Sequence, residues 1–364
     1  MRIKDITRYL ESLAPLSFQE PYDNSGLIIG EPEKEINSVL LTLDVTSEVL
    51  QEAVGQGVGL IIAHHPLIFS GLKKLTGSNV IEKLVVKAIQ ENIAIYAAHT
   101  NMDVIPAGVN SYLCKALNLK NIHVLRPLED SLLKLVTFVP EPHLEKVRQS
   151  LFLAGAGSVG NYDQCSFIMN GTGSFRGGDN TDPFVGEKGK IHFEKEVRLE
   201  TIFPVHLKKD LLHALVKAHP YEEVAYDIYS LGNVNEQAGM GLIGELEEAM
   251  DEIELLKKIK SILGSTVIKH TALLGKQVKT VAVCGGTGSF ILKDAIKKNA
   301  DIFISGDFKY HEFFDAEGKI LIADAGHYET EHHVKDVFYE LLKEKFPTFA
   351  FRISEVNTNP VKFI

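Results

Sequence analysis

Two adjacent histidines, His64 and His65, end an apolar segment, and their imidazoles are the first candidates for chemistry. The segment 59–66 (GLIIAHHP) is short and rich in isoleucine, which predicts a buried strand, and its proline ends regular structure. Side chains alternate between the two faces of a strand, so both imidazoles can reach one site only if the strand ends before them. Ligands of open α/β sheets bind at the carboxyl ends of the strands, and the pair is therefore expected at such an edge.

Further side chains of the same types follow other predicted strands. His99, Asn101 and Asp103 come after the apolar segment 93–98, and His327 comes shortly after the segment 319–326 (KILIADAG). If His327 opens a helix, Glu331 lies four residues on and shares its face. Imidazoles combined with carboxylates suit zinc, iron, manganese or nickel better than calcium or magnesium. The pattern predicts a metal site made by five residues: His64, His65, Asp103, His327 and Glu331.

A less specific interpretation of these residues stays open. A single histidine at the end of a strand is more often a hydrogen-bonded structural residue than a ligand. The alternative to a metal site is therefore a solvated loop edge that happens to be rich in histidine.

The elements that must position these residues alternate between strands and helices, which indicates a parallel sheet covered by helices. We expect an α/β fold with a mainly parallel sheet, in a discontinuous domain formed by residues 1–128 and 278–364. The strands after residue 278 are expected to complete the sheet that begins before residue 128. Residues 129–277 contain a βαβ–βαβ order, which predicts an inserted ferredoxin-like α+β domain and a return segment.

Composition excludes several classes of protein. The chain has 364 residues, 45% of them hydrophobic, and a net charge of −10, which disfavours a nucleic-acid surface. It has neither the apolar core of a signal peptide nor a charge-free stretch of about 20 residues, so we expect a cytoplasmic protein without membrane partners. Its three cysteines are far apart, which suggests neither a disulfide framework nor a thiolate zinc site.

A glycine-rich turn at residues 281–290 (VAVCGGTGSF) has the order strand, turn and helix start that can bind a phosphate. It lacks both the GxGxxG pattern and the lysine of a P-loop. We therefore expect a tight structural turn rather than a nucleotide-binding loop.

Five motifs in order resemble the NIF-three-like family, whose members are often called GTP cyclohydrolase 1 type 2 homologs. They are DNSGL (23–27), AHHP (63–66), AHTNMD (98–103), ISGD (304–307) with Tyr310 and His311, and DAGHYETE (324–331). The resemblance covers essentially the whole chain and implies a two-metal centre held by His64, His65, Asp103, His327 and Glu331, with Glu331 as a bridge. It also implies a homo-oligomer, commonly a hexamer, and an insert like the PII or CutA proteins.

Two divalent ions that share a water molecule would favour hydrolysis, and five protein ligands would leave positions open for a substrate. Zinc is the first expectation, with iron, manganese or nickel as alternatives. His99 and His311 are candidates for proton transfer, or else for hydrogen bonds to the ligands. Asp23 and Asn24 are expected to cap their loop, and the alternative is that they line the cleft.

Two hypotheses follow for the function. The first is a metal-dependent hydrolase of a small, nucleotide-like substrate. The alternative is a metal-binding regulatory or chaperone-like protein whose insert senses a small ligand without turnover.

Overall fold

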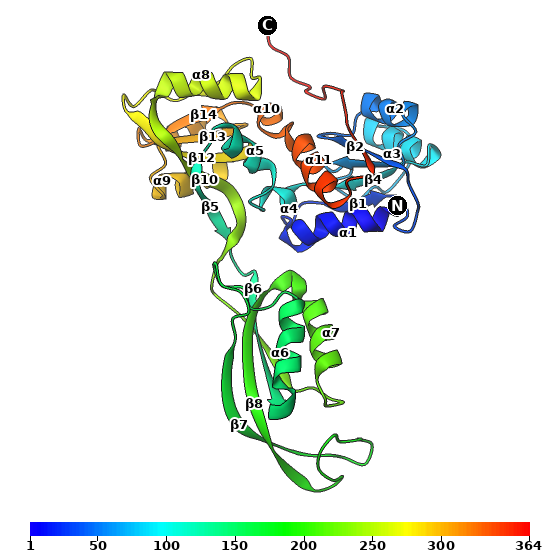
Figure 1. The fold of residues 1–364 in the computed structure, drawn as a ribbon. Coiled ribbons are helices and arrows are strands. Elements are labelled where there is room, and N and C mark those ends of the chain that lie inside the picture. The colour runs from blue at the N-terminus through cyan, green and yellow to red at the C-terminus, as the bar shows by residue number, and fades with distance from the viewer. The chain divides into compact units, whose positions relative to one another are not determined.

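The computed structural model describes residues 1–364 and divides them into two compact units. Unit 1 combines Met1–Pro127 with Gln237–Ile364, and unit 2 is Leu128–Glu236 (Figure 1). The second boundary between the units lies after Glu236, whereas the sequence predicted it after residue 277. Strand β10 (Asn235–Asp251) pairs with a strand of unit 1, so the return segment belongs to unit 1 rather than to the insert.

The first sheet of unit 1 is built mainly from the N-terminal part of the chain. Its strands lie in the order β1-β4-β3-β2-β15, with β1 antiparallel and the other pairs parallel. Every residue of β2 and β3 is buried, as expected for parallel strands covered on both faces. The strands are β1 (Gly26–Ile29), β2 (Ser38–Thr42), β3 (Leu60–Ala63), β4 (Ala94–Ala97) and β15 (Ala350–Ile353).

Helices cover this sheet with their apolar sides. Leu50 of α2 and Leu84 of α3 share a core cluster with Ile61 of β3, whereas α11 contacts β2 and β15. Thr46 and Asn79 accept hydrogen bonds from the first turns of α2 and α3, which fixes where both helices begin. Helices α5 and α10 instead contact β12 of the second sheet. The helices of residues 1–116 and 327–345 are α1 (Ile3–Leu13), α2 (Ser47–Gly55), α3 (Val80–Gln90), α4 (Thr100–Asp103), α5 (Val109–Ala116), α10 (His327–Glu331) and α11 (Val334–Lys345).

The second sheet of unit 1 has the order β11-β14-β13-β12-β10-β5. Its three middle strands β12, β13 and β14 are parallel to one another. Helices α5 and α8 pack on one face, and α9 with the 3-10 helix η5 packs on the other. The elements are β5 (Lys120–Leu128), β10 (Asn235–Asp251), α8 (Glu252–Leu263), β11 (Lys269–His270), β12 (Gln277–Thr287), α9 (Leu292–Lys297), β13 (Ile302–Gly306), η5 (Tyr310–Ala316) and β14 (Leu321–Asp324).

The expectation that the strands after residue 278 complete the first sheet is correct for β15 and wrong for the others. Strands β12, β13 and β14 pair with one another and with β10 and β11, and only β15 returns to the first sheet. Each sheet buries its own apolar clusters, so the strand alternation is correct but the pairing of its two halves is not. The predicted ligands therefore come from two sheets rather than from one.

Unit 2 has the chain order β6, α6, β7, β8, α7, β9 and one antiparallel sheet in the order β7-β8-β6-β9. Helices α6 and α7 lie on one face of that sheet (Figure 1) and share a core with β6 and β8. The elements are β6 (Leu132–Pro140), α6 (Leu144–Leu153), β7 (Phe167–Arg176), β8 (Ile191–Pro204), α7 (Lys208–Ala218) and β9 (Tyr226–Ser230).

No helix of this structure combines the length and the apolar character that crossing a membrane requires.

Candidate metal centre

His64 and His65 lie just beyond the end of β3, which stops at Ala63. Their backbone amides both donate to the carbonyl oxygen of Leu43, at 3.1 and 3.0 Å. The strand has therefore ended before the histidines, and both rings can turn toward one site. Their ring centroids lie 5.0 Å apart.

The two acidic residues of the cluster and its third histidine lie on short helices. Asp103 is the last residue of α4, which follows β4, and His327 and Glu331 are the first and last residues of α10, which follows β14. Their four-residue spacing brings His327 Nε2 to 2.9 Å from Glu331 Oε2.

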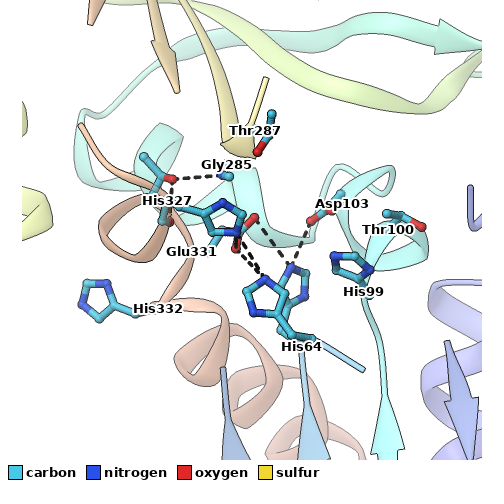
Figure 2. A network of polar contacts seen from close by, with 12 residues as sticks. His64, His99, Thr100, Asp103, Gly285, Thr287, His327, Glu331 and His332 are labelled. Atoms are coloured by element: carbon cyan, nitrogen blue, oxygen red, sulfur yellow. Dashed lines mark hydrogen bonds and ion pairs between the residues drawn. The ribbon is translucent and has the colours of Figure 1, made fainter. Parts of the chain in front are cut away.

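Glu331 lies at the middle of the cluster, and its two oxygens contact different groups (Figure 2). Oε2 lies 3.0 Å from His65 Nε2, whereas Oε1 lies 3.9 Å from His64 Nε2. His64 Nε2 is also 3.6 Å from Asp103 Oδ1. The structure thus brings together all five residues that the sequence pattern predicted.

Potential ligand atoms of this cluster form three groups of three, each within 4.8 Å. They are His65, His327 and Glu331; His64, Asp103 and Glu331; and His64, His65 and His99.

The Nε2 atom of His64 shows that these residues suit a cation. The side chain has no exposed surface, and Nε2 has no hydrogen-bond partner. A buried polar atom without a partner costs free energy, and most such atoms in folded proteins are paired. Because Nδ1 donates to the carbonyl of Ala98 at 2.8 Å, Nε2 keeps a lone pair directed to the cluster.

His65, His99 and His327 also donate Nδ1 to an acceptor, which for these three residues is an aspartate carboxylate. Nδ1 lies 2.7 Å from a carboxylate oxygen in each of three pairs, and a threonine hydroxyl also donates to each carboxylate. The sets are His65, Asp44 and Thr358; His327, Asp307 and Thr287; and His99, Asp23 and Thr100. Metal-binding histidines commonly donate their second nitrogen to such an acceptor, which fixes the tautomer and the ring orientation.

The electrostatics of the cluster favour positive charge. Burial opposes protonation, but hydrogen bonds to Asp44 and Glu331 raise the pKa of His65 to about 10. Burial likewise opposes protonation of His327, but hydrogen bonds to Glu331 and Asp307 raise its pKa to about 9. The pKa of His64 instead falls to about 3 because burial dominates.

The two acidic members of the cluster differ. Burial and the neighbouring Glu331 raise the pKa of Asp103. Burial alone would raise the pKa of Glu331 as well, but hydrogen bonds from His327 and His65 hold it well below its usual range. The central carboxylate is therefore held in its charged form.

A cavity of about 520 Å³ opens onto the cluster. His65, His99, Asp103, His327 and Glu331 line it together with apolar side chains that include Phe69 and Phe290. Its volume lies in the range typical of sites for small molecules.

His99 and His311, the two histidines predicted for proton transfer, lie in different places. The centroid of the His99 ring is 5.2 Å from that of His64 and 5.4 Å from that of His65. Figure 2 shows His99 on the same side of the cluster as His64. His311 is exposed on η5, stacks against Phe314 and does not line the cavity. The structure therefore brings His99, and not His311, to the cluster.

Asp23 does more than cap its loop. Its carboxylate accepts hydrogen bonds from the ring of His99 and from the backbone amide and hydroxyl of Thr100. Burial opposes ionisation, but these bonds hold the pKa of Asp23 well below its usual range.

The glycine turn after β12 is structural, as expected. The amides of Gly285 and Gly286 donate to Asn110 and Thr330 within the protein. Gly286 has a φ of +60°, and a Cβ there would lie 2.1 Å from Glu331 Oε1. Glycine is therefore required at this position to admit the central carboxylate.

Sequence reasoning missed Asp44 and Asp307, the acceptors behind His65 and His327. The sequence did carry a signal, because Asp307 directly follows β13 and Asp44 lies two residues after the end of β2. Nothing in the local sequence indicates Thr358, which reaches Asp44 from a position 314 residues away.

Comparisons with known proteins agree over the full length of the chain. The family model described as Duf34/NIF3 (NGG1p interacting factor 3) matches residues 1–360. Two relatives are both named "GTP cyclohydrolase 1 type 2 homolog". The relative from Halalkalibacterium halodurans is 40% identical over 99% of this chain and 98% of its own length, and the one from Bacillus subtilis is 39% identical over the same shares.

A solved structure leads to the same family. The crystal structure of a Bacillus cereus protein related to NIF3 superposes with a TM-score of 0.84 and 38% sequence identity, and covers 100% of this chain and 99% of its own. The chain described here therefore belongs to the Duf34/NIF3 family.

Proposed function

We propose that the cluster binds two divalent metal ions and that the protein is a metal-dependent hydrolase of a small substrate. One ion would be held by His65, His327 and Glu331, and the other by His64, Asp103 and Glu331. The observation that carries this proposal is the position of Glu331, whose two oxygens contact two different groups of candidate ligands.

Zinc is the preferred ion, because three imidazoles and two carboxylates are nitrogen and oxygen donors of the kind that zinc binds. Iron, manganese or nickel suit the same donors. Bound divalent ions would supply Lewis acidity and make water a nucleophile near neutral pH.

The protein's own groups would bind and orient the reactants. Asp44 and Asp307 fix the orientation of His65 and His327. Asp23 accepts the Nδ1 proton of His99, which leaves Nε2 of that cavity-lining ring to accept or donate a proton. His311 has no place in this proposal, because it lies outside the cavity.

The substrate is proposed to be a small, nucleotide-like molecule. The size of the cavity and the name of the relatives, "GTP cyclohydrolase 1 type 2 homolog", support this class. Opening a nitrogen heterocycle is a hydrolysis, as is cleavage of a phosphoester, and a pair of divalent ions suits both reactions.

Metal content tests the ligand assignment. His65→Ala and Glu331→Ala should each reduce the zinc bound per folded chain below two ions, as measured by elemental analysis after dialysis. The loss should be larger for Glu331→Ala, because it removes a ligand from both sites. His311→Ala is the matched control and should keep two ions per chain.

Two ions per chain in both ligand variants would contradict the assignment. Activity is tested separately, with the zinc-loaded protein and a panel of GTP, cyclic amides and phosphoesters. Absence of turnover on the whole panel, with two ions bound, would contradict the hydrolase and leave the metal centre intact.

Two proposals concern the remainder of the molecule. Unit 2 is proposed to be a ferredoxin-like domain of the PII or CutA kind, which its β-α-β-β-α-β order and its sheet order support. The protein is also proposed to form a homo-hexamer, and its mass in solution by light scattering is the test.

A further inference from the structure

A second cavity, of about 580 Å³, lies entirely within unit 2. All of its lining residues fall between Phe138 and Ala225, so none of them belongs to the metal centre. Its wall includes strands β7 and β8, part of the segment 177–184 and residues 221–223. Cavities of this size accommodate a single small molecule.

One side of the cavity is the face of the sheet that α6 and α7 do not cover. Residues directly paired in adjacent strands point to the same face, and Phe138, Arg198 and Met169 form one such row across three strands. Glu196 is paired in the same way with Gly171. The alternate residues of β6 and β8 contribute to the apolar core beneath the helices.

Glu196 is a fixed hydrogen-bond acceptor in this cavity. The hydroxyl of Tyr221 donates to its Oε1 at 2.9 Å. Gly173 leaves room for the carboxylate, because a Cβ at that position would lie 1.9 Å from Glu196 Oε2. A side chain at residue 173 would therefore displace the carboxylate that Tyr221 holds.

Arg198 supplies a donor beside this acceptor. Its Nη2 pairs with Glu200 Oε1 at 2.8 Å, which anchors the guanidinium, while its Nε is buried without a partner. Residues two apart in a strand are separated by about 7 Å and share a face. Glu196 and Arg198 therefore line the same wall of the cavity, one as an anionic acceptor and the other as a cationic donor.

Three aromatic rings lie close to one another in this cavity. The centroid of the Phe175 ring lies 5.9 Å from that of Tyr221 at an interplanar angle of 62°, and the centroid of the Phe184 ring lies 6.2 Å from it at 49°. All three residues line the cavity. Aromatic walls of this kind bury the faces of a planar ring and leave its edge to the polar groups.

We propose that this cavity binds a planar nitrogen heterocycle whose edge carries an N–H donor beside a carbonyl acceptor. Glu196 accepts from the N–H group, the Arg198 guanidinium donates to the carbonyl, and the rings of Phe175, Phe184 and Tyr221 pack around the heterocycle. This site is separate from the metal centre, and it does not depend on the function proposed above.

Guanosine carries such an edge and is the probe for the full chain, by isothermal titration calorimetry in EDTA. Adenosine lacks the carbonyl, and 1-methylguanosine lacks the ring N–H, so both should bind at least about tenfold more weakly. Glu196→Gln should weaken guanosine binding by a similar factor. The metal-centre variant Glu331→Ala should bind guanosine as the unchanged protein does.

Filling the cavity gives an independent test. A Cβ at Gly171 meets only a backbone oxygen at 3.8 Å, so Gly171→Leu should fold and place its side chain where the ligand lies. Gly178 lies near the cavity but does not line it and has open space around it, so Gly178→Leu is the matched control. Guanosine binding should be lost in the first variant and kept in the second.

The proposal is overturned if guanosine fails to bind at millimolar concentration, or if Glu196→Gln and Gly171→Leu both bind it unchanged. Equal binding of guanosine and 1-methylguanosine would overturn the assigned role of Glu196. Loss of binding in Glu331→Ala alone would place guanosine at the metal centre and contradict a site in unit 2.

Discussion

At the scale of single residues, the centre is defined as much by what holds the histidines as by the histidines themselves. Three of the four rings donate Nδ1 to an aspartate, and each aspartate accepts a further hydrogen bond from a threonine. The fourth, His64, donates to a backbone carbonyl instead. The hydrogen bond at Nδ1 therefore fixes the tautomer of each ring and directs Nε2 toward a cation or a proton.

Asp44→Asn tests the importance of this support. The change removes the charge that accepts from His65 Nδ1 at 2.7 Å and leaves all five proposed ligands in place. Zinc affinity should fall by roughly 10- to 100-fold, as is typical when such a partner of a metal-binding histidine is removed. Competition with a chromophoric chelator measures the affinity.

Thr358→Val is the companion variant, because it removes only the hydroxyl that donates to the other oxygen of Asp44. Its loss of affinity should be smaller than that of Asp44→Asn. Zinc affinity equal to that of the unchanged protein in Asp44→Asn would show that the aspartate does not support the centre.

At the scale of elements, two short helices that follow strands place the clustered side chains. The four residues of α4 carry Asp103 past the end of β4, and the five residues of α10 place His327 and Glu331 on one face. Gly286 at the end of β12 lets Glu331 approach the turn closely. The position of the site therefore depends on where the strands stop.

The start of α3 provides a test at this scale. The Glu82 carboxylate accepts hydrogen bonds from the amides and hydroxyls of Thr76 and Ser78 and from the side chain of Asn79. The backbone amide of Ser78 is the largest contribution that lowers its pKa, to about 2. Glu82→Gln should destabilise the protein near neutral pH and should speed hydrogen exchange at Thr76 and Ser78.

The sign of the pH dependence follows from the lowered pKa. The stabilisation by Glu82 is complete above its ordinary pKa of 4.5 and is lost as the pH falls toward about 2. The difference in free energy of unfolding between the unchanged protein and Glu82→Gln should therefore shrink over that range. Glu91→Gln, at an exposed residue after the same helix, is the control, and a difference independent of pH would contradict the assignment.

At the scale of the whole molecule, the two units have separate apolar cores. The core of unit 2 is formed by residues from Leu133 to Ala218, whereas the clusters of unit 1 contain no residue of that range. Units with their own cores can unfold as separate cooperative transitions.

Differential scanning calorimetry should therefore resolve two transitions. Zinc should raise only the midpoint of unit 1, since a ligand stabilises the unit that binds it. Leu215→Ala, at a leucine of α7 with no exposed surface, should destabilise unit 2 by about 2–5 kcal/mol and lower only the midpoint of unit 2. Leu153→Ala, at a leucine of α6 that is 90% exposed, is the control. One transition that responds to both zinc and Leu215→Ala would contradict independent unfolding.

Much of the local structure could be predicted from the sequence because it depends on nearby residues. Strand β3 lies within the predicted segment 59–66, and β4 and β14 lie within the segments 93–98 and 319–326. The sequence signals are short apolar runs and breakers such as Pro66. The set of five clustered residues was also predictable, because four of them lie within a few residues of a strand end and Glu331 is one helical turn from His327.

Tertiary structure alone decided how these pieces combine. Strand periodicity does not encode which strands pair, so β12, β13 and β14 could form a second sheet that the sequence pattern did not indicate. Local sequence likewise does not indicate that Thr358 bonds to Asp44, because the two residues are 314 positions apart in the chain. Nor does it indicate that His311 lies outside the cavity. The sequence by itself determined which residues were available for chemistry, and the packing of two sheets decided which of them met, because long-range contacts depend on the whole fold rather than on local pattern.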